Sequence, residues 1–94
     1  MIRVLIERRV AEGMVEVYQL AVREVRREAT QQPGYISGET LRDAADPCRY
    51  VIISTWKDEA DWERWAGSDA RRRLLARIAP LLEEPERVSV LLPV

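Results

Sequence analysis

Apolar residues alternate with polar ones, or form short continuous runs, in four stretches of this 94-residue chain. Such stretches, when rich in β-branched side chains, are typical of β-strands. The chain therefore supplies enough strands for a four-stranded sheet. The strands are predicted at residues 2–8, 35–43, 49–56 and 86–92.

Between the strands, apolar residues recur every three or four positions, which is the spacing of one face of a helix. A first helix is predicted over residues 14–32, because Pro33 cannot continue it. Asp58 is suited to cap a second, short helix that ends at a Gly-Ser-Asp break. Ser68 then restarts the chain as a last helix, which Pro80 interrupts.

The predicted order, β-α-β-β-α-α-β, is the split βαβ arrangement of ferredoxin-like folds. We therefore predict a single α+β domain over residues 1–94 with a four-stranded antiparallel sheet. Its helices can cover only one face of that sheet, yet the third strand is apolar on both, with Tyr50 and Ile52 alternating with Val51 and Ile53. The second face is therefore expected to pack against the sheet of a second copy, in a homodimer.

Charge and composition narrow the choice of partners. The chain has 15 basic and 16 acidic residues, mixed along its length, which does not favour nucleic acid. No apolar run reaches the roughly 18 to 20 residues that span a bilayer, and the N-terminus is too charged for a signal peptide. We expect a cytoplasmic protein without a membrane partner. With no histidine and one cysteine, Cys48, the usual zinc ligand sets cannot form, and no metal or cofactor is expected.

All three tryptophans fall in one short stretch, TWKDEADWERW. Core packing is the ordinary role of tryptophan in a chain without phenylalanine, and it is the role expected for Trp62. Trp56 stands at a strand end, where packing at a rim or dimer edge is an equal alternative. Trp65 precedes the Gly-Ser-Asp break, which opens space around its ring. A planar apolar ligand could stack there, with the indole NH as a donor.

The same stretch carries a recognisable pattern. A Pro-Gly turn and strand are followed by the spacing W-x-[DES]-x-x-x-[FW]-x-x-W-x-x-S, and the order of elements agrees along nearly the whole chain. In both respects the sequence resembles the antibiotic biosynthesis monooxygenase family. The resemblance implies a dimeric α+β barrel, in which two sheets pack face to face. The matching residues are Trp56, Asp58, Trp62, Trp65 and Ser68.

The resembled family includes cofactor-free oxygenases of polyketide and quinol substrates, haem-degrading enzymes, and members without assigned activity. The resemblance implies that Trp65 is the tryptophan that lines the substrate pocket in this family. Asp61 stands where the cofactor-free oxygenases tend to carry asparagine. An ionised carboxylate can only accept hydrogen bonds, so Asp61 could serve as a general base toward a phenol or enol. The alternative is a first-turn charge that the helix dipole favours.

The haem-degrading branch places a histidine ten residues beyond the pocket tryptophan, where this chain has Leu75, and an asparagine near the end of the first strand, where it has Glu7 or Arg8. Leucine cannot bind iron. We expect Arg8, together with Trp62 and Tyr18, to line a substrate pocket instead. The arginines of the last helix are predicted to form an exposed face; the alternative is a contact from Arg73 or Arg77 to an acidic substrate or the partner subunit. These arginines are Arg71, Arg72, Arg73 and Arg77.

The sequence therefore predicts a cofactor-independent monooxygenase that acts on a small planar oxidisable compound, such as a quinol or an aromatic polyketide. Asp61 and Trp65 are its predicted catalytic residues. Two alternatives stay open: a non-catalytic small-molecule-binding barrel, and a haem-binding protein with unusual ligation. The absence of both histidine and asparagine favours the first of these alternatives.

Overall fold

The computed structural model describes all 94 residues and has the predicted order of elements. The four strands and three helices expected from the sequence are confirmed, with a short 3-10 helix where Pro80 interrupts the last one. The elements are β1 (Ile2–Arg9), α1 (Val15–Thr30), β2 (Tyr35–Arg42), β3 (Arg49–Trp56), α2 (Glu59–Ala66), α3 (Asp69–Ile78), η1 (Ala79–Leu81) and β4 (Arg87–Leu91).

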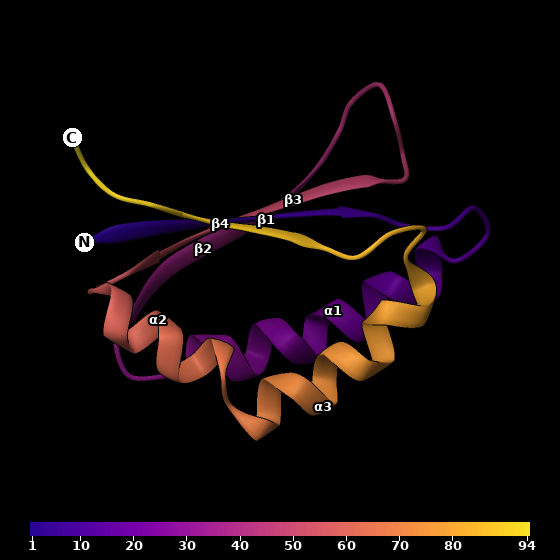
Figure 1. Cartoon of the computed structure of the whole chain (residues 1–94). Helices are drawn as coiled ribbons and strands as arrows, with labels where there is room; N and C mark the ends of the chain where they lie inside the picture. Colours follow the sequence, from indigo (N-terminus) through magenta and orange to yellow (C-terminus); the bar gives the residue numbers. More distant parts are fainter.

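The strands form one antiparallel sheet in the order β2-β3-β1-β4, so the ferredoxin-like α+β fold is confirmed. Figure 1 shows all three helices on one side of this sheet, with the other side uncovered. None of the helices has both the length and the apolar character needed to cross a membrane. The dimer expected from the sequence stays a prediction, because the structure is that of one chain.

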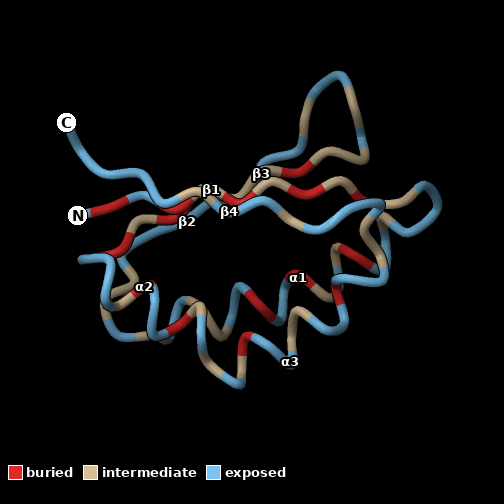
Figure 2. Tube along the Cα trace, in the orientation of Figure 1, coloured by how far each residue is buried: buried red, intermediate tan, exposed pale blue.

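Side chains alternate between the two faces of the sheet. On the face beneath the helices, Ile2, Val4 and Ile6 of β1 are buried, and Figure 2 shows this burial on the layer between sheet and helices. The opposite face carries Leu5 of β1 directly across from Ile53 of β3, and both are half-buried although no helix covers them. The uncovered face thus has the apolar centre that the sequence pattern predicted, flanked by charged residues such as Glu7 and Arg49.

Side chains cap the N-terminal ends of both α2 and α3. The Asp58 carboxylate accepts a hydrogen bond from the backbone N–H of Asp61 at 2.9 Å, and the Ser68 hydroxyl accepts one from that of Arg71 at 3.1 Å. Each cap satisfies a backbone donor that the first helical turn leaves free. Both predicted caps are confirmed. The Asp58 cap fixes the start of the helix that carries Trp62 and Trp65, and the Ser68 cap fixes the break after Trp65 and the start of the helix that carries Arg71.

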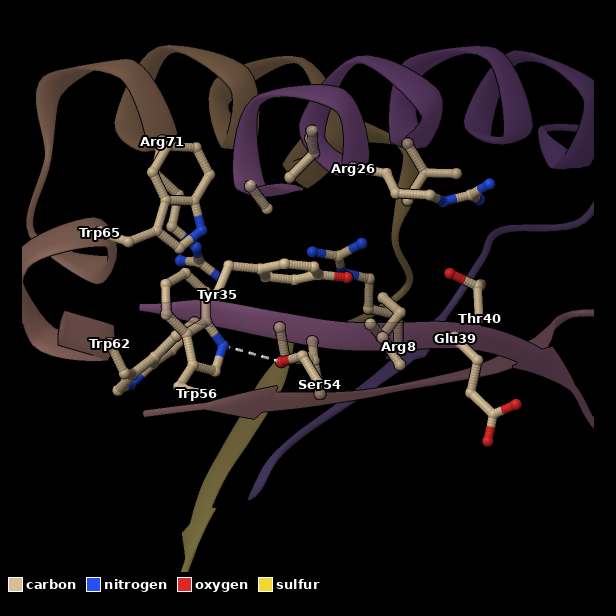
Figure 3. Close-up of a pocket in the computed structure, with 16 residues that line it drawn as sticks. Arg8, Arg26, Tyr35, Glu39, Thr40, Ser54, Trp56, Trp62, Trp65 and Arg71 are labelled. Carbon is tan, nitrogen blue, oxygen red and sulfur yellow. Dashed lines mark hydrogen bonds between the residues drawn. The ribbon is translucent and has the colours of Figure 1, made fainter. Parts of the chain in front are cut away.

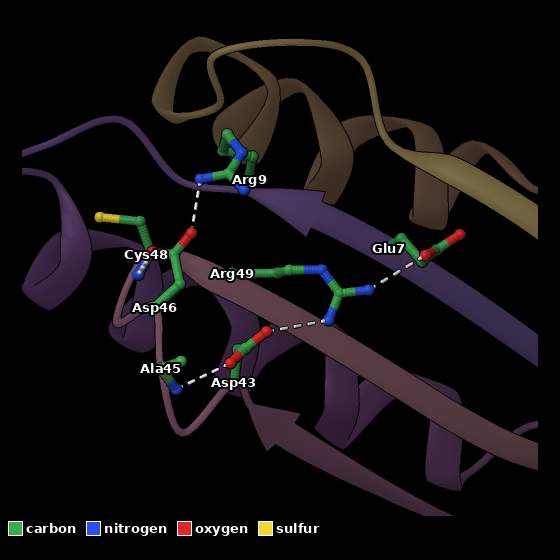
Figure 4. A network of polar contacts seen from close by, with 7 residues as sticks. All are labelled: Glu7, Arg9, Asp43, Ala45, Asp46, Cys48 and Arg49. Atoms are coloured by element: carbon green, nitrogen blue, oxygen red, sulfur yellow. Dashed lines mark hydrogen bonds and ion pairs between the residues drawn. The ribbon is translucent and has the colours of Figure 1, made fainter.

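The loop between β2 and β3 is held by polar contacts to the end of β1 (Figure 4). The Asp46 carboxylate accepts the backbone N–H of Cys48 at 3.0 Å and pairs with Arg9 at 2.7 Å. Arg49, at the start of β3, reaches Glu7 of β1 at 3.3 Å. These contacts fix the register of the hairpin against β1. Cys48 takes part through its backbone, and its thiol is free.

Candidate functional site

A cavity of about 60 Å³ lies between the helices and the covered face of the sheet. Figure 3 shows the side chains that surround it: tryptophan rings at one end, and arginines above and beside it. All three tryptophans line this cavity, together with apolar side chains of α1 and β3. The sequence therefore concentrates its largest aromatic side chains around one small cavity that is partly open to solvent.

The tryptophans differ in how they are held. Trp56 is only 1% exposed, and its indole nitrogen donates to the Ser54 hydroxyl at 3.0 Å. Its ring meets that of Trp62 edge to face, with 5.6 Å between centroids, a favourable geometry for aromatic pairs. Trp56 is thus a fixed wall of the core rather than a rim residue. Trp65, also buried, makes no hydrogen bond through its indole nitrogen, so this donor stays available to a ligand.

Tyr35 extends its ring into the middle of the cavity (Figure 3). It is the first residue of β2, and its ring meets that of Trp56 edge to face at 5.4 Å. Its hydroxyl lies over Gly38, where the missing side chain leaves room for it. Burial raises the pKa of the Tyr35 phenol, and the positive charge of Arg26 opposes that change. The strand predicted at residues 35–43 includes Tyr35, but the sequence pattern did not predict its place in the cavity.

Two buried arginines share one carboxylate beside the cavity. Arg8 Nε donates to Oε1 of Glu86 at 2.9 Å, and Arg71 Nη2 donates to Oε2 at 3.2 Å. The Arg8 side chain is only 1% exposed and that of Arg71 only 7%. Both arginines also line the cavity. The cluster of Arg8, Arg71 and Glu86, called here the arginine cluster, therefore carries a net charge of +1 in a largely dry place.

Tyr18 supports this cluster from behind. Its hydroxyl accepts a hydrogen bond from Arg8 Nη1 at 3.2 Å, and its ring packs 4.9 Å from that of Tyr50. Burial raises the pKa of the Tyr18 phenol, and the positive charge of Arg8 opposes that change. Of the predicted pocket residues, Arg8 and Trp62 line the cavity. Tyr18 does not, and it holds Arg8 in place instead.

Arg71 is the site residue that the sequence interpretation placed wrongly. Arg72, Arg73 and Arg77 are exposed as predicted, but Arg71 is buried, with its guanidinium 5.3 Å from the centre of the Trp62 ring. Burial lowers the pKa of Arg71, and the carboxylate of Glu86 opposes this. The sequence did contain a clue to this burial. Leu74, Leu75 and Ile78 follow Arg71 by three, four and seven residues, so Arg71 lies on the apolar stripe of α3.

Asp61 lies apart from the cavity. Its carboxylate pairs with Arg64 at 2.8 Å, one turn further along α2, and packs against Gly34 of the preceding turn. It is not among the residues that line the cavity. Of the two predicted catalytic residues, the structure thus brings Trp65 to the cavity, but not Asp61. The role of Asp61 as a base stays a prediction.

The whole chain superimposes on several solved structures. An antibiotic biosynthesis monooxygenase gives a TM-score of 0.91 at 20% identity, covering 100% of this chain and 99% of that one. Rv0793 from Mycobacterium tuberculosis gives 0.88 at 16% identity, covering 99% and 94%. SnoaB, a cofactor-independent oxygenase from Streptomyces nogalater, gives 0.86 at 15% identity, covering 99% and 93%. At these identities the similarity establishes a shared fold.

Sequence comparison adds the family. No protein of curated function matches this chain. The sequence pattern of one family, described as antibiotic biosynthesis monooxygenase, matches residues 1–77. This match spans most of the chain, including β1, all of α2 and the tryptophan-rich segment that carried the resemblance. The protein belongs to the antibiotic biosynthesis monooxygenase family.

Proposed function

We propose that this protein is a homodimeric, cofactor-independent monooxygenase that oxidises a small planar compound, such as a quinol or an aromatic polyketide. The observation that carries the proposal is the cavity between helices and sheet, which joins three tryptophan side chains to two buried arginines in a chain of this family. SnoaB, which has the same fold, is a cofactor-independent oxygenase. Flat aromatic walls suit a flat aromatic substrate.

In such a reaction the substrate itself supplies the electrons. Loss of a proton from an anthrone-type carbon or a phenol gives an electron-rich anion, which transfers electrons to O₂ and forms a carbon–oxygen bond. Cleavage of the O–O bond then leaves one oxygen as a carbonyl on the substrate. The other oxygen leaves as water with two hydrogens of the substrate: both come from the oxidised carbon of an anthrone, whereas a phenol gives one from the ring carbon and one from its hydroxyl. Arg8 and Arg71 would stabilise the anion, and Trp65 would bound the ring and donate its indole NH.

The cavity has to enlarge before such a substrate can enter. A cavity of roughly 150 Å³ accommodates benzene, whereas this one measures about 60 Å³. Tyr35 fills the missing space with a phenol ring of its own. Because Tyr35 stands at the beginning of β2, directly after the Pro33–Gly34 turn, an outward movement of its ring would open the cavity from that side.

The uncovered face of the sheet supports the proposed homodimer. Leu5, Val51 and Ile53 lie there without any helix above them. Burial of apolar surface is worth roughly 25 cal/mol per Å², so a second sheet packed on this face would stabilise both copies. Packing of two such sheets gives the dimeric barrel that the family resemblance implies.

One observation favours a non-catalytic binding module as the alternative. The only carboxylate-bearing residue that lines the cavity is Glu39, and Figure 3 shows its carboxylate pointing away from the tryptophans and arginines. A base in direct contact with the ligand is therefore missing. A protein that only binds an aromatic anion needs no such base.

Oxygen consumption tests the proposal. Purified protein is incubated aerobically with hydroquinones and anthrones, and the oxygen uptake is compared with that of buffer and of the Trp65→Ala variant. Uptake above background that falls in Trp65→Ala supports the oxygenase. Equal uptake by wild type, Trp65→Ala and Asp61→Ala would exclude the proposed site. Quenching of tryptophan fluorescence by these compounds, without any oxygen uptake, would instead support the binding module.

A further inference from the structure

We infer that the cavity binds its aromatic ligand as an anion, with a carboxylate or phenolate oxygen against the guanidinium groups of Arg8 and Arg71. This inference rests on the proposed function for the planar shape of the ligand. The charge of the ligand follows from the arginine cluster alone. The inference gives a role in ligand recognition to Arg71, which was predicted to lie on an exposed face.

The first step is the charge balance. Glu86 has two carboxylate oxygens, and each already accepts a hydrogen bond from one arginine. Tyr18, the other group bonded to Arg8, is a neutral hydroxyl. The charged groups that act on Arg71 are Glu86 and Arg8, so no second acid is at hand. One positive charge therefore lacks a partner, and an arginine cannot lose its proton to escape this.

The second step is the direction of the unused donors. Arg71 binds Glu86 through Nη2, and Arg8 binds Glu86 and Tyr18 through Nε and Nη1. Each guanidinium therefore keeps N–H groups without a partner in the chain. No fully buried side-chain nitrogen or oxygen lacks a partner, so these N–H groups are not sealed inside the core. Because both arginines line the cavity, the unused donors are open to a ligand there.

The third step is the surroundings. The cavity wall also includes Arg26 of α1, which adds positive charge on another side (Figure 3). The remaining wall is mainly apolar and aromatic, so water screens the charges of the buried Arg8 and Arg71 poorly, whereas it screens that of the exposed Arg26. Charge-assisted hydrogen bonds from arginine to an oxyanion are about twice as strong as neutral ones. A neutral ligand of the same shape would leave the surplus charge uncompensated.

Matched ligands test this inference without any turnover. Binding of 2-naphthoate and of its neutral analogue 2-naphthamide is measured by quenching of tryptophan fluorescence and by calorimetry. We expect 2-naphthoate to bind at least about tenfold more tightly. A third probe, 2-naphthol, separates the two sources of the anion, because its bound phenolate is visible in the absorption spectrum. If the phenol is the natural group, its ionisation should shift at least about one pH unit downward on binding.

Variants of the cluster give a charge series. Arg71→Met makes the cluster neutral and should abolish the preference for 2-naphthoate, whereas Glu86→Gln makes it +2 and should increase that preference. Arg71→Lys keeps the charge and should retain it. Arg73→Met, on the exposed side of the same helix, is the matched control and should behave as wild type. If Arg71→Met does not fold, the inference is still tested by comparing the binding of 2-naphthoate and 2-naphthamide to wild type and to Glu86→Gln.

The inference is overturned if the protein shows no preference for 2-naphthoate and no downward shift for 2-naphthol, or if none of the three probes binds. A preference that is unchanged in folded Arg71→Met would also overturn it. The outcome is separate from that of the oxygenase proposal. Anion preference without oxygen uptake excludes the oxygenase and leaves this inference standing. Oxidation of neutral quinols by a protein that shows no preference for 2-naphthoate would support the oxygenase and overturn this inference.

Discussion

The hydroxyl of Tyr35 lies over Gly38, three residues further along the same strand, and a β-carbon at position 38 would collide with it. The backbone of Gly38 does not have the positive φ that excludes other residues, since only Gly13 and Gly34 do. The glycine is therefore required here for space. It allows the Tyr35 ring to occupy the cavity, where that ring fills part of the volume that a substrate needs.

We predict that Gly38→Ala displaces the Tyr35 ring from the cavity and leaves the fold intact. The expected loss of stability is about 1 to 2 kcal/mol, since the added methyl group overpacks its surroundings. Affinity for a planar aromatic probe should rise, because the competing ring has moved. Chemical denaturation and ligand titration measure both effects. Gly67→Ala is the control, because a β-carbon there meets only an ordinary contact. Unchanged binding, with Tyr35 still over position 38 in a variant structure, would contradict the prediction.

A second prediction concerns Asp61. Because its carboxylate pairs with Arg64 and does not line the cavity, we expect Asp61→Asn to keep oxygen uptake within about twofold of wild type. The Asp61 side chain is only 15% exposed but that of Arg64 is 63% exposed, and asparagine has the same shape as aspartate, so the loss of this pair should cost roughly 0 to 1 kcal/mol. Initial rates at saturating quinol provide the measurement, with Asp69→Asn as an exposed control on α3. A loss of about a hundredfold or more would instead establish Asp61 as the base.

The order of elements and the helix caps could be predicted from the sequence because they depend on local chemistry. Asp58 and Ser68 cap the helices that they precede, whatever the rest of the chain does. Pro33 and Gly34 mark a turn for equally local reasons, and Gly34 has the positive φ of +86° that such a turn requires. The identification of Trp65 as a cavity residue came from the same stretch, because the break after it is also local.

The arginine cluster could not be predicted in this way, since it depends on three segments far apart in the chain. Arg8 comes from β1, Arg71 from α3, and Glu86 from the residue before β4. Read alone, Arg71 belongs to a run of three arginines, and such runs are normally solvated. Its place on the apolar stripe of Leu74, Leu75 and Ile78 separates it from Arg72 and Arg73, but that place does not reveal its partner Glu86. The place of the Tyr35 ring in the cavity could not be predicted for a similar reason, because it depends on the absence of a side chain at Gly38.

A third prediction concerns the uncovered face of the sheet. The wild-type chain should have about twice the 10.9 kDa monomer mass in light scattering, because the apolar face packs against its copy. Ile53→Arg places a charge in the middle of this face, next to Leu5, and should give a folded monomer.

Leu20→Arg is the control for the dimer. Leu20 is an equally apolar residue that is 63% exposed on α1, on the helical side of the molecule. This substitution should leave the dimer intact. A wild-type mass near that of the monomer, or an Ile53→Arg variant that remains dimeric, would contradict the sheet-to-sheet dimer.

The last prediction concerns acid stability at the β2–β3 loop. The hydrogen bond from the Cys48 backbone N–H, together with the hydrogen bond from Arg9, holds the pKa of the Asp46 carboxyl below its usual range. The unfolded chain therefore binds this proton more readily than the folded one. The stabilisation by Asp46 is fully present above the unfolded pKa of about 3.9, and it is lost as the pH falls toward the lower native value.

In Asp46→Asn the amide oxygen still accepts the Cys48 N–H, but the charge that attracts Arg9 is gone. We therefore expect the variant to be less stable than wild type at pH 6 and to lose less stability between pH 4 and about pH 2.5. Urea denaturation at a series of pH values measures both curves. Asp69→Asn removes an exposed carboxylate that contacts only Arg72, and it should follow the wild-type curve. If Asp46→Asn lost stability in acid as steeply as wild type, the Asp46 carboxylate would have no part in anchoring this loop to β1.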